Sequence, residues 1–163
     1  MVRITDKGIR FEMLIKRADT ALENDYCIEA STIYYAIIEE RFHSILDTLE
    51  VTYNKRNCKM YHGIQRMKNI LSTGHYVENP QENSIDNLLD YRISTLMQQE
   101  YDINLLINLD IWRVKRNSIT HNFAKENMDY NDVRDWAKEG KNLLRNLLSS
   151  TMRFNKKKKK MGI

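Results

Sequence analysis

The chain has 163 residues, of which 42% are hydrophobic and 29% are charged, and it contains five glycines and one proline. All-β domains and doubly wound α/β domains of this length need many tight turns built with such residues, so the composition argues against both classes and favours an all-α fold. The formal net charge is +4, but residues 153–163 carry six cations and no acid, which leaves −2 for residues 1–152. Bulk charge therefore does not indicate a nucleic-acid-binding body.

Cysteine usage and hydropathy predict a reduced, cytoplasmic, soluble protein. The two cysteines, Cys27 and Cys58, have no C-x-x-C spacing. No apolar run approaches the length of about 20 residues that a membrane span needs, and no signal-peptide core follows the first residues.

Apolar residues recur at helical spacing along most of the chain, and about five amphipathic helices account for them. A short polar turn at Asn24 and Asp25 separates the first two, which should pack as a long antiparallel hairpin. Pro80 lies in the main irregular connection, residues 72–83. The predicted helices cover about residues 11–22, 26–49, 60–71, 85–97 and 133–147.

Polar residues indicate where the later helices begin and end. Ser84 and Asn131 are predicted as N-caps. Asp102 leaves two alternatives open, because the fourth helix either ends there or continues into the 110s. We expect one helical domain over residues 1–152, followed by a basic, disordered tail at 153–163, which contains five consecutive lysines.

The segment IWRVKRNSITHN, residues 111–122, carries the strongest candidate chemistry. Arginine holds phosphate groups, histidine transfers protons near neutral pH, and RNA supplies its own nucleophile in the 2′-hydroxyl. Arg116 and His121 are five positions apart, which on an ideal helix is about 140° beyond a full turn. If both act in one site, the helix should end, bend or tighten near Asn117 and Ser118. For an isolated pair of this kind, the commoner explanation is that Arg116 makes a surface ion pair and that His121 caps a helix.

The string Arg-Asn-Ser-Ile-Thr-His at residues 116–121 resembles the signature of the HEPN superfamily, in which an arginine and a histidine are separated by four to six residues. The long helical hairpin before it, with the segment EASTIYYA at 29–36, is similar as well, and the resemblance extends over about residues 6–150. It implies a HEPN-like helical bundle that dimerises and brings two Arg/His pairs to a shared cleft. Many members are metal-independent endoribonucleases that act as toxins or antiviral defence effectors.

Carried over by position, the resemblance implies that Arg116 holds the scissile phosphate and that His121 acts as general acid or base. Asn117 would orient the pair or contact the phosphate. Cleavage of RNA would leave a 2′,3′-cyclic phosphate and a 5′-hydroxyl, with no cofactor. Because the body of the chain is not basic, RNA recognition would depend on cations near the cleft, and Arg113 and Lys115 are the candidates.

Two further points bear on function and partners. An antitoxin or a nucleotidyltransferase is the expected partner protein, but Phe123 stands where one toxin subgroup has a tyrosine that such a transferase modifies. Silencing by that modification is therefore not expected here. The alternative function is a catalytically silent HEPN-like module that binds RNA, a nucleotide or a partner protein.

Other candidate metal ligands are weaker. Glu40 and His43 form an E-x-x-H of the type found in di-metal helical bundles, but the chain has no second copy. Cys58 and His62 lie four positions apart, without the four closely spaced ligands that are typical of structural zinc. We predict no metal site, and we expect His43 on a helix surface or interface and Cys58 as a buried or partly buried thiol.

Overall fold

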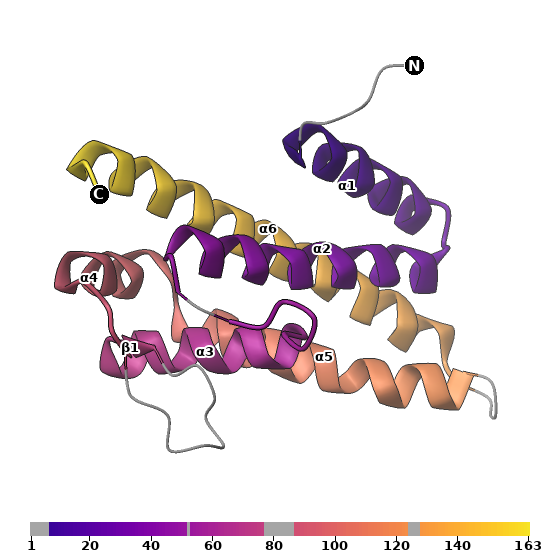
Figure 1. The fold of residues 1–163 in the computed structure, drawn as a ribbon. Helices are drawn as coiled ribbons and strands as arrows, with labels where there is room; N and C mark the ends of the chain where they lie inside the picture. Colours follow the sequence, from indigo (N-terminus) through magenta and orange to yellow (C-terminus); the bar gives the residue numbers. More distant parts are fainter. Residues whose placement is uncertain (1–6, 52, 77–86, 124–127) are drawn as a thin grey trace.

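The computed structural model describes residues 7–51, 53–76, 87–123 and 128–163, and over these residues the fold is all-α, as predicted (Figure 1). Two two-residue strands pair antiparallel beside the helices, with His75 opposite Leu88. Among the described helices, none combines the length and the apolarity needed to cross a lipid bilayer. The elements are α1 (Lys7–Glu23), α2 (Cys27–Thr48), α3 (Met60–Thr73), β1 (His75–Tyr76), β2 (Asn87–Leu88), α4 (Tyr91–Glu100), α5 (Ile103–Phe123) and α6 (Tyr130–Met161).

A pair of tryptophans holds α5 against α6. The Trp112 indole donates to the carbonyl of Trp136 at 2.8 Å, and the Trp136 indole donates to the carbonyl of Trp112 at 3.1 Å. The two rings stack with 5.3 Å between their centroids, and a Cβ at Gly140 would lie only 2.4 Å from the Trp112 ring. Because both buried indole N–H groups are satisfied, this contact fixes the rotation of α5 one turn before Arg116.

The fourth helix begins later than predicted. Residues 87–88 lie in β2, and α4 starts at Tyr91, where the Asp90 carboxylate accepts a hydrogen bond from the backbone N–H of Arg92 at 2.8 Å. An aspartate at this position is a good N-cap, which explains the start. The predicted cap, Ser84, lies outside the described residues.

Aspartates also determine the boundaries of α5 and α6. The helix α4 ends at Glu100, before Asp102, since Tyr101 is extended. The Asp102 carboxylate accepts a hydrogen bond from the backbone N–H of Asn104 at 2.8 Å, at the start of α5. The first of the two alternatives is therefore correct, and the described residues contain six helices rather than about five. The N-cap of α6 is Asp129 and not the predicted Asn131. The Asp129 carboxylate accepts a hydrogen bond from the backbone N–H of Asn131 at 2.9 Å.

The prediction of a disordered tail is wrong for residues 153–161, because α6 continues through the lysine run to Met161. Phe154 is buried in the core. Arg153 donates to the buried carboxylate of Glu100 at 3.1 Å, and Lys157 donates to the same carboxylate. These contacts join α6 to the end of α4 and keep the segment helical.

Replacing Glu100 by Gln is expected to lower the free energy of unfolding by roughly 1–2 kcal/mol at neutral pH, because two charge-assisted hydrogen bonds to half-exposed cations are weakened. The hydrogen bonds from Lys157 and then Arg153 hold the pKa of Glu100 below its ordinary value. This stabilisation is therefore present above the pKa of the unfolded chain and is lost as pH falls through the lower folded-state pKa.

Chemical denaturation of the wild type and of Glu100→Gln, between about pH 7 and pH 3, measures this effect. Glu12, an exposed glutamate of α1, provides the control variant, Glu12→Gln. The difference between wild type and Glu100→Gln should shrink at the acid end. A difference that stays constant with pH would contradict the assignment.

Candidate active site

The helix α5 runs without interruption through the segment that resembles the HEPN signature. Asn117 and Ser118, where a break was expected, are helical and exposed. Arg116 and His121 therefore keep the ideal separation of about 140° around the helix axis and point in different directions. Within one chain, Arg116 extends over Tyr35 of α2, whereas His121 is exposed to solvent.

Arg116 is a half-buried cation without a carboxylate partner among the described residues. Its guanidinium lies over the ring of Tyr35 from α2, 4.2 Å from the ring centroid. The Tyr35 ring is in turn 6.0 Å from that of Trp112, so the tryptophan contact also supports this arginine. Stacking on an aromatic face leaves the planar fork of N–H donors available for a phosphate.

The two cations predicted to bind RNA differ in their surroundings. Arg113 pairs with Asp110 at 2.9 Å and lies over the ring of Tyr61, 5.1 Å from its centroid. Lys68 also reaches Asp110, at 3.5 Å. Lys115 is exposed and has no ion pair within the described part of the chain. Lys115 is therefore the better of the two candidates for a phosphate contact.

His121 lies in the last turn of α5 and is exposed. Neighbouring polar side chains form hydrogen bonds to other residues of α5. Thr120 donates to the carbonyl of Arg116, and Asn122 donates to the Ser118 hydroxyl at 3.3 Å. No residue that the structure describes forms a hydrogen bond with the His121 ring. Both ring nitrogens can therefore meet a ligand from solution.

The outer face of α5 carries an exposed apolar stripe that the sequence analysis missed. Its members lie four, four and three positions apart, and continuing this spacing leads through Ser118 to His121. The opposite face of α5 is buried, so the helix is apolar on both sides, which is unusual for a surface helix and typical of an interface. The α5 stripe consists of Ile103 (36% exposed), Ile107 (40%), Ile111 (59%) and Val114 (54%).

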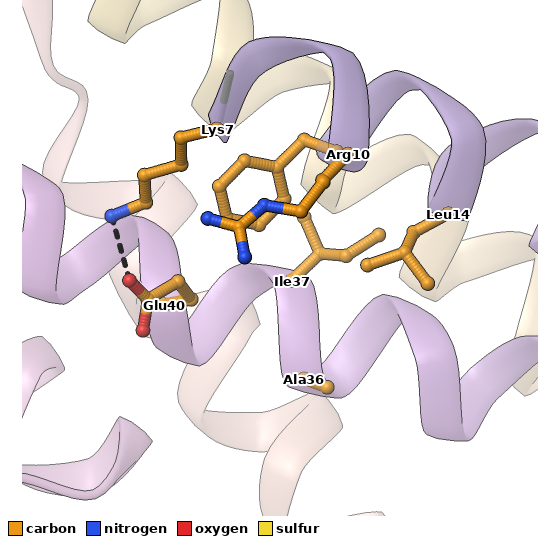
Figure 2. Close-up of a pocket in the computed structure, with 7 residues that line it drawn as sticks. Lys7, Arg10, Leu14, Ala36, Ile37 and Glu40 are labelled. Atoms are coloured by element: carbon orange, nitrogen blue, oxygen red, sulfur yellow. Dashed lines mark ion pairs between the residues drawn. The ribbon is translucent and has the colours of Figure 1, made fainter. Parts of the chain in front are cut away.

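A pocket of about 270 Å³ lies between α1 and α2, away from the predicted site residues (Figure 2). Its lining is mostly apolar, with Phe11, Leu14 and Ile37 among the residues that form it. Lys7 and Glu40 form an ion pair at 2.6 Å at one side. The pocket brings together no nucleophile and base, so it is not the candidate site.

The other residues considered as metal ligands make structural contacts in and around the connection between α2 and α3. His43 approaches the Glu40 carboxylate at 3.3 Å and the carbonyl of Cys58 at 2.6 Å, so it joins α2 to this connection. Cys58 is buried, as predicted, and burial raises the pKa of its thiol. The His62 ring accepts from the backbone N–H of Lys59 at 3.2 Å. Across the described residues, no three His, Cys, Asp or Glu side chains are grouped for a metal ion.

Comparisons with models of protein families, with curated proteins and with solved structures returned no match. The functional assignment therefore depends on the residues of the site itself.

Proposed function

We propose that this chain is a metal-independent endoribonuclease of HEPN type whose site combines Arg116 and His121 from two copies of the chain. The observation that carries the proposal is the direction of these two side chains on an uninterrupted α5. Because they diverge within one chain, a site that uses both on one phosphate has to draw them from two copies. The α5 stripe, whose spacing continues to His121, is the surface through which a second copy would pack.

The chemistry follows from the groups themselves. Arg116 would hold the scissile phosphate through two parallel N–H donors and balance the charge that develops on its oxygens. One His121 would accept the proton of the 2′-hydroxyl while the 2′-oxygen attacks phosphorus and the bond to the 5′-oxygen breaks. That leaving oxygen would take a proton from the solvent, so each of the two symmetry-related sites would use one Arg116 and one His121. The products are a 2′,3′-cyclic phosphate and a 5′-hydroxyl.

Exposed polar residues on the same two turns would assist. Asn117 is exposed and would contact the phosphate, and Lys115 would bind the RNA backbone beside the cleft. The resemblance to HEPN proteins extends the proposal to a cytoplasmic toxin or defence effector, held inactive by an antitoxin. The alternative function is a catalytically silent module that binds RNA, a nucleotide or a partner protein through the same exposed residues, without a composite site.

Cleavage of single-stranded RNA in the presence of EDTA distinguishes the two functions. The wild-type chain is expected to cut the RNA and to leave 2′,3′-cyclic phosphate ends, which mass spectrometry identifies. The same sequence with 2′-O-methyl groups should stay intact, because it lacks the nucleophile. RNA left whole by the wild type would favour the silent module, and cutting of the methylated RNA would contradict the proposed chemistry.

A further inference from the structure

The second half of α6 carries positive charge without a compensating acid. The acids of α6 lie in its first three turns, at Asp132, Asp135 and Glu139. Residues 140–163 contain eight cations and no aspartate or glutamate. A favourable interaction with the helix dipole accounts for lysines in the last turn, but it does not extend to the earlier turns.

Five of these eight cations have partners in the fold, and three do not. Lys156, Lys159 and Lys160 are exposed, and their side chains form no ion pair or hydrogen bond with any residue that the structure describes. They are separated by three and four positions and so share one face of the helix. The five with partners are Lys141 and Arg145 at Asp19, Arg153 and Lys157 at Glu100, and Lys158 at the carbonyl of Thr48.

The three unpartnered lysines are held in place by the packing beneath them. Phe154 is buried two positions before Lys156, and the Glu100 contacts tie the same turns to α4. The side chains therefore project from a fixed helix instead of a mobile tail. A fixed cationic face loses less conformational entropy on binding than a flexible one.

This face lies far from the candidate active site. The end of α5, the helix that carries Arg116 and His121, lies near the beginning of α6, whereas the lysines belong to the other end of α6 (Figure 1). From Tyr130 to Lys156, the rise of an α-helix gives a separation of roughly 40 Å. The face would thus hold a part of a ligand that is remote from the scissile bond.

We infer that Lys156, Lys159 and Lys160 form a binding face for the phosphate backbone of single-stranded RNA, outside the cleavage site. This inference rests on the proposed function, which makes RNA the ligand. The positive charge of the three lysines complements a polyanion. Because α6 carries no aspartate or glutamate after Glu139, no acid of this part of the helix repels the phosphates. A membrane-binding helix would instead carry a row of large apolar side chains beside the lysines. In this part of α6, the exposed large apolar side chains are those of two residues, Met152 and Met161.

Point substitutions test the face, because deleting residues 153–163 would remove the buried Phe154 and the partners of Glu100. The test variant combines Lys156→Gln, Lys159→Gln and Lys160→Gln, and glutamine preserves helix propensity. A matched control removes the same charge from exposed positions on α1 and before α3. The control variant combines Arg10→Gln, Lys16→Gln and Arg56→Gln.

The probe is a single-stranded 2′-O-methyl RNA, long enough to follow α6, whose binding is measured over a range of salt concentrations. The test variant is expected to bind about tenfold more weakly at low salt, and the slope of log affinity against log salt should fall by about two. The control variant should keep both quantities close to those of the wild type. Equal losses in the two variants, or no loss in the test variant, would overturn the inference.

Three further features of the experiment distinguish RNA binding at the lysines from RNA cleavage and from binding to lipid. The probe cannot be cleaved, so its binding is scored whether or not the chain is a ribonuclease. Cleavage of a dinucleotide should be unchanged in the test variant, because so short a substrate does not reach the lysines. Vesicles containing phosphatidylserine serve as the second ligand. Lysine-dependent binding to the vesicles, with RNA binding unaffected, would replace RNA by a membrane surface.

Discussion

Alanine at either Arg116 or His121 is expected to lower the rate of RNA cleavage by roughly 10²–10⁴-fold. The arginine would lose its hold on the phosphate, and the histidine would no longer transfer the proton. The exposed His121 contributes no packing, so its removal should leave the thermal unfolding midpoint unchanged. The measurement is single-turnover cleavage of a labelled RNA in EDTA, with circular dichroism as the check on folding.

Two further variants sharpen this experiment. Arg116→Lys keeps the charge but loses the planar fork and its stacking on Tyr35, so it should restore only a small part of the lost rate. Arg56→Ala removes an exposed arginine in the connection between α2 and α3 and should cleave like the wild type. Wild-type rates in both Arg116→Ala and His121→Ala would identify a contaminating nuclease and remove the proposed activity.

Glutamate at Ile111 is expected to prevent formation of the proposed dimer and to abolish cleavage with it. Ile111 is the most exposed member of the α5 stripe, at 59%, and a two-fold interface would contain the introduced charge twice. An unpaired charge buried at the centre of an interface should weaken association by about 30-fold or more. Sedimentation over a range of concentrations, together with the cleavage assay, measures both effects.

Met13→Glu is the matched control for the α5 stripe. Met13 on α1 is 55% exposed and apolar, and it lies outside the stripe. This variant should dimerise and cleave like the wild type. A wild-type chain that stays monomeric, or an Ile111→Glu variant that stays dimeric, would show that the stripe is not the interface.

Helical periodicity was sufficient to predict the all-α class and the breaks between the first three helices. It was misleading between residues 85 and 90, where Leu88 and Leu89 fit a helical stripe. Asp90 is the residue that caps α4, and Leu88 belongs to β2. At Asp102, periodicity did not decide whether the fourth helix ends or continues. An aspartate can lie within a helix, or its carboxylate can accept hydrogen bonds from the first backbone N–H groups of the next helix.

The lysine run shows why a low-complexity segment is hard to interpret from its own composition. Its order depends on Glu100, which lies 53 positions before Arg153, and on the burial of Phe154. Neither contact leaves a local signal at residues 156–160. Long-range partners of this kind become visible only when the fold brings α4 and α6 together.

For the candidate site, the sequence predicted which residues take part, but it left open whether Arg116 and His121 face one position. Helix geometry alone predicts that Arg116 and His121 diverge, and the continuous α5 retains this divergence. Which of them faces solvent depends on the contact between Trp112 and Trp136, which are 24 positions apart. The α5 stripe was detectable in principle, since apolar residues on two opposite sides of a surface helix indicate a second partner.

Mixing the Arg116→Ala and His121→Ala variants tests the composite site most directly. After subunit exchange, about half of the dimers contain one copy of each variant, and each such dimer keeps one site with both groups. The mixture should therefore recover about a quarter of the wild-type cleavage rate, although each variant alone is inactive. A mixture as inactive as its components, with exchange verified by differently tagged chains, would contradict a site built from two copies.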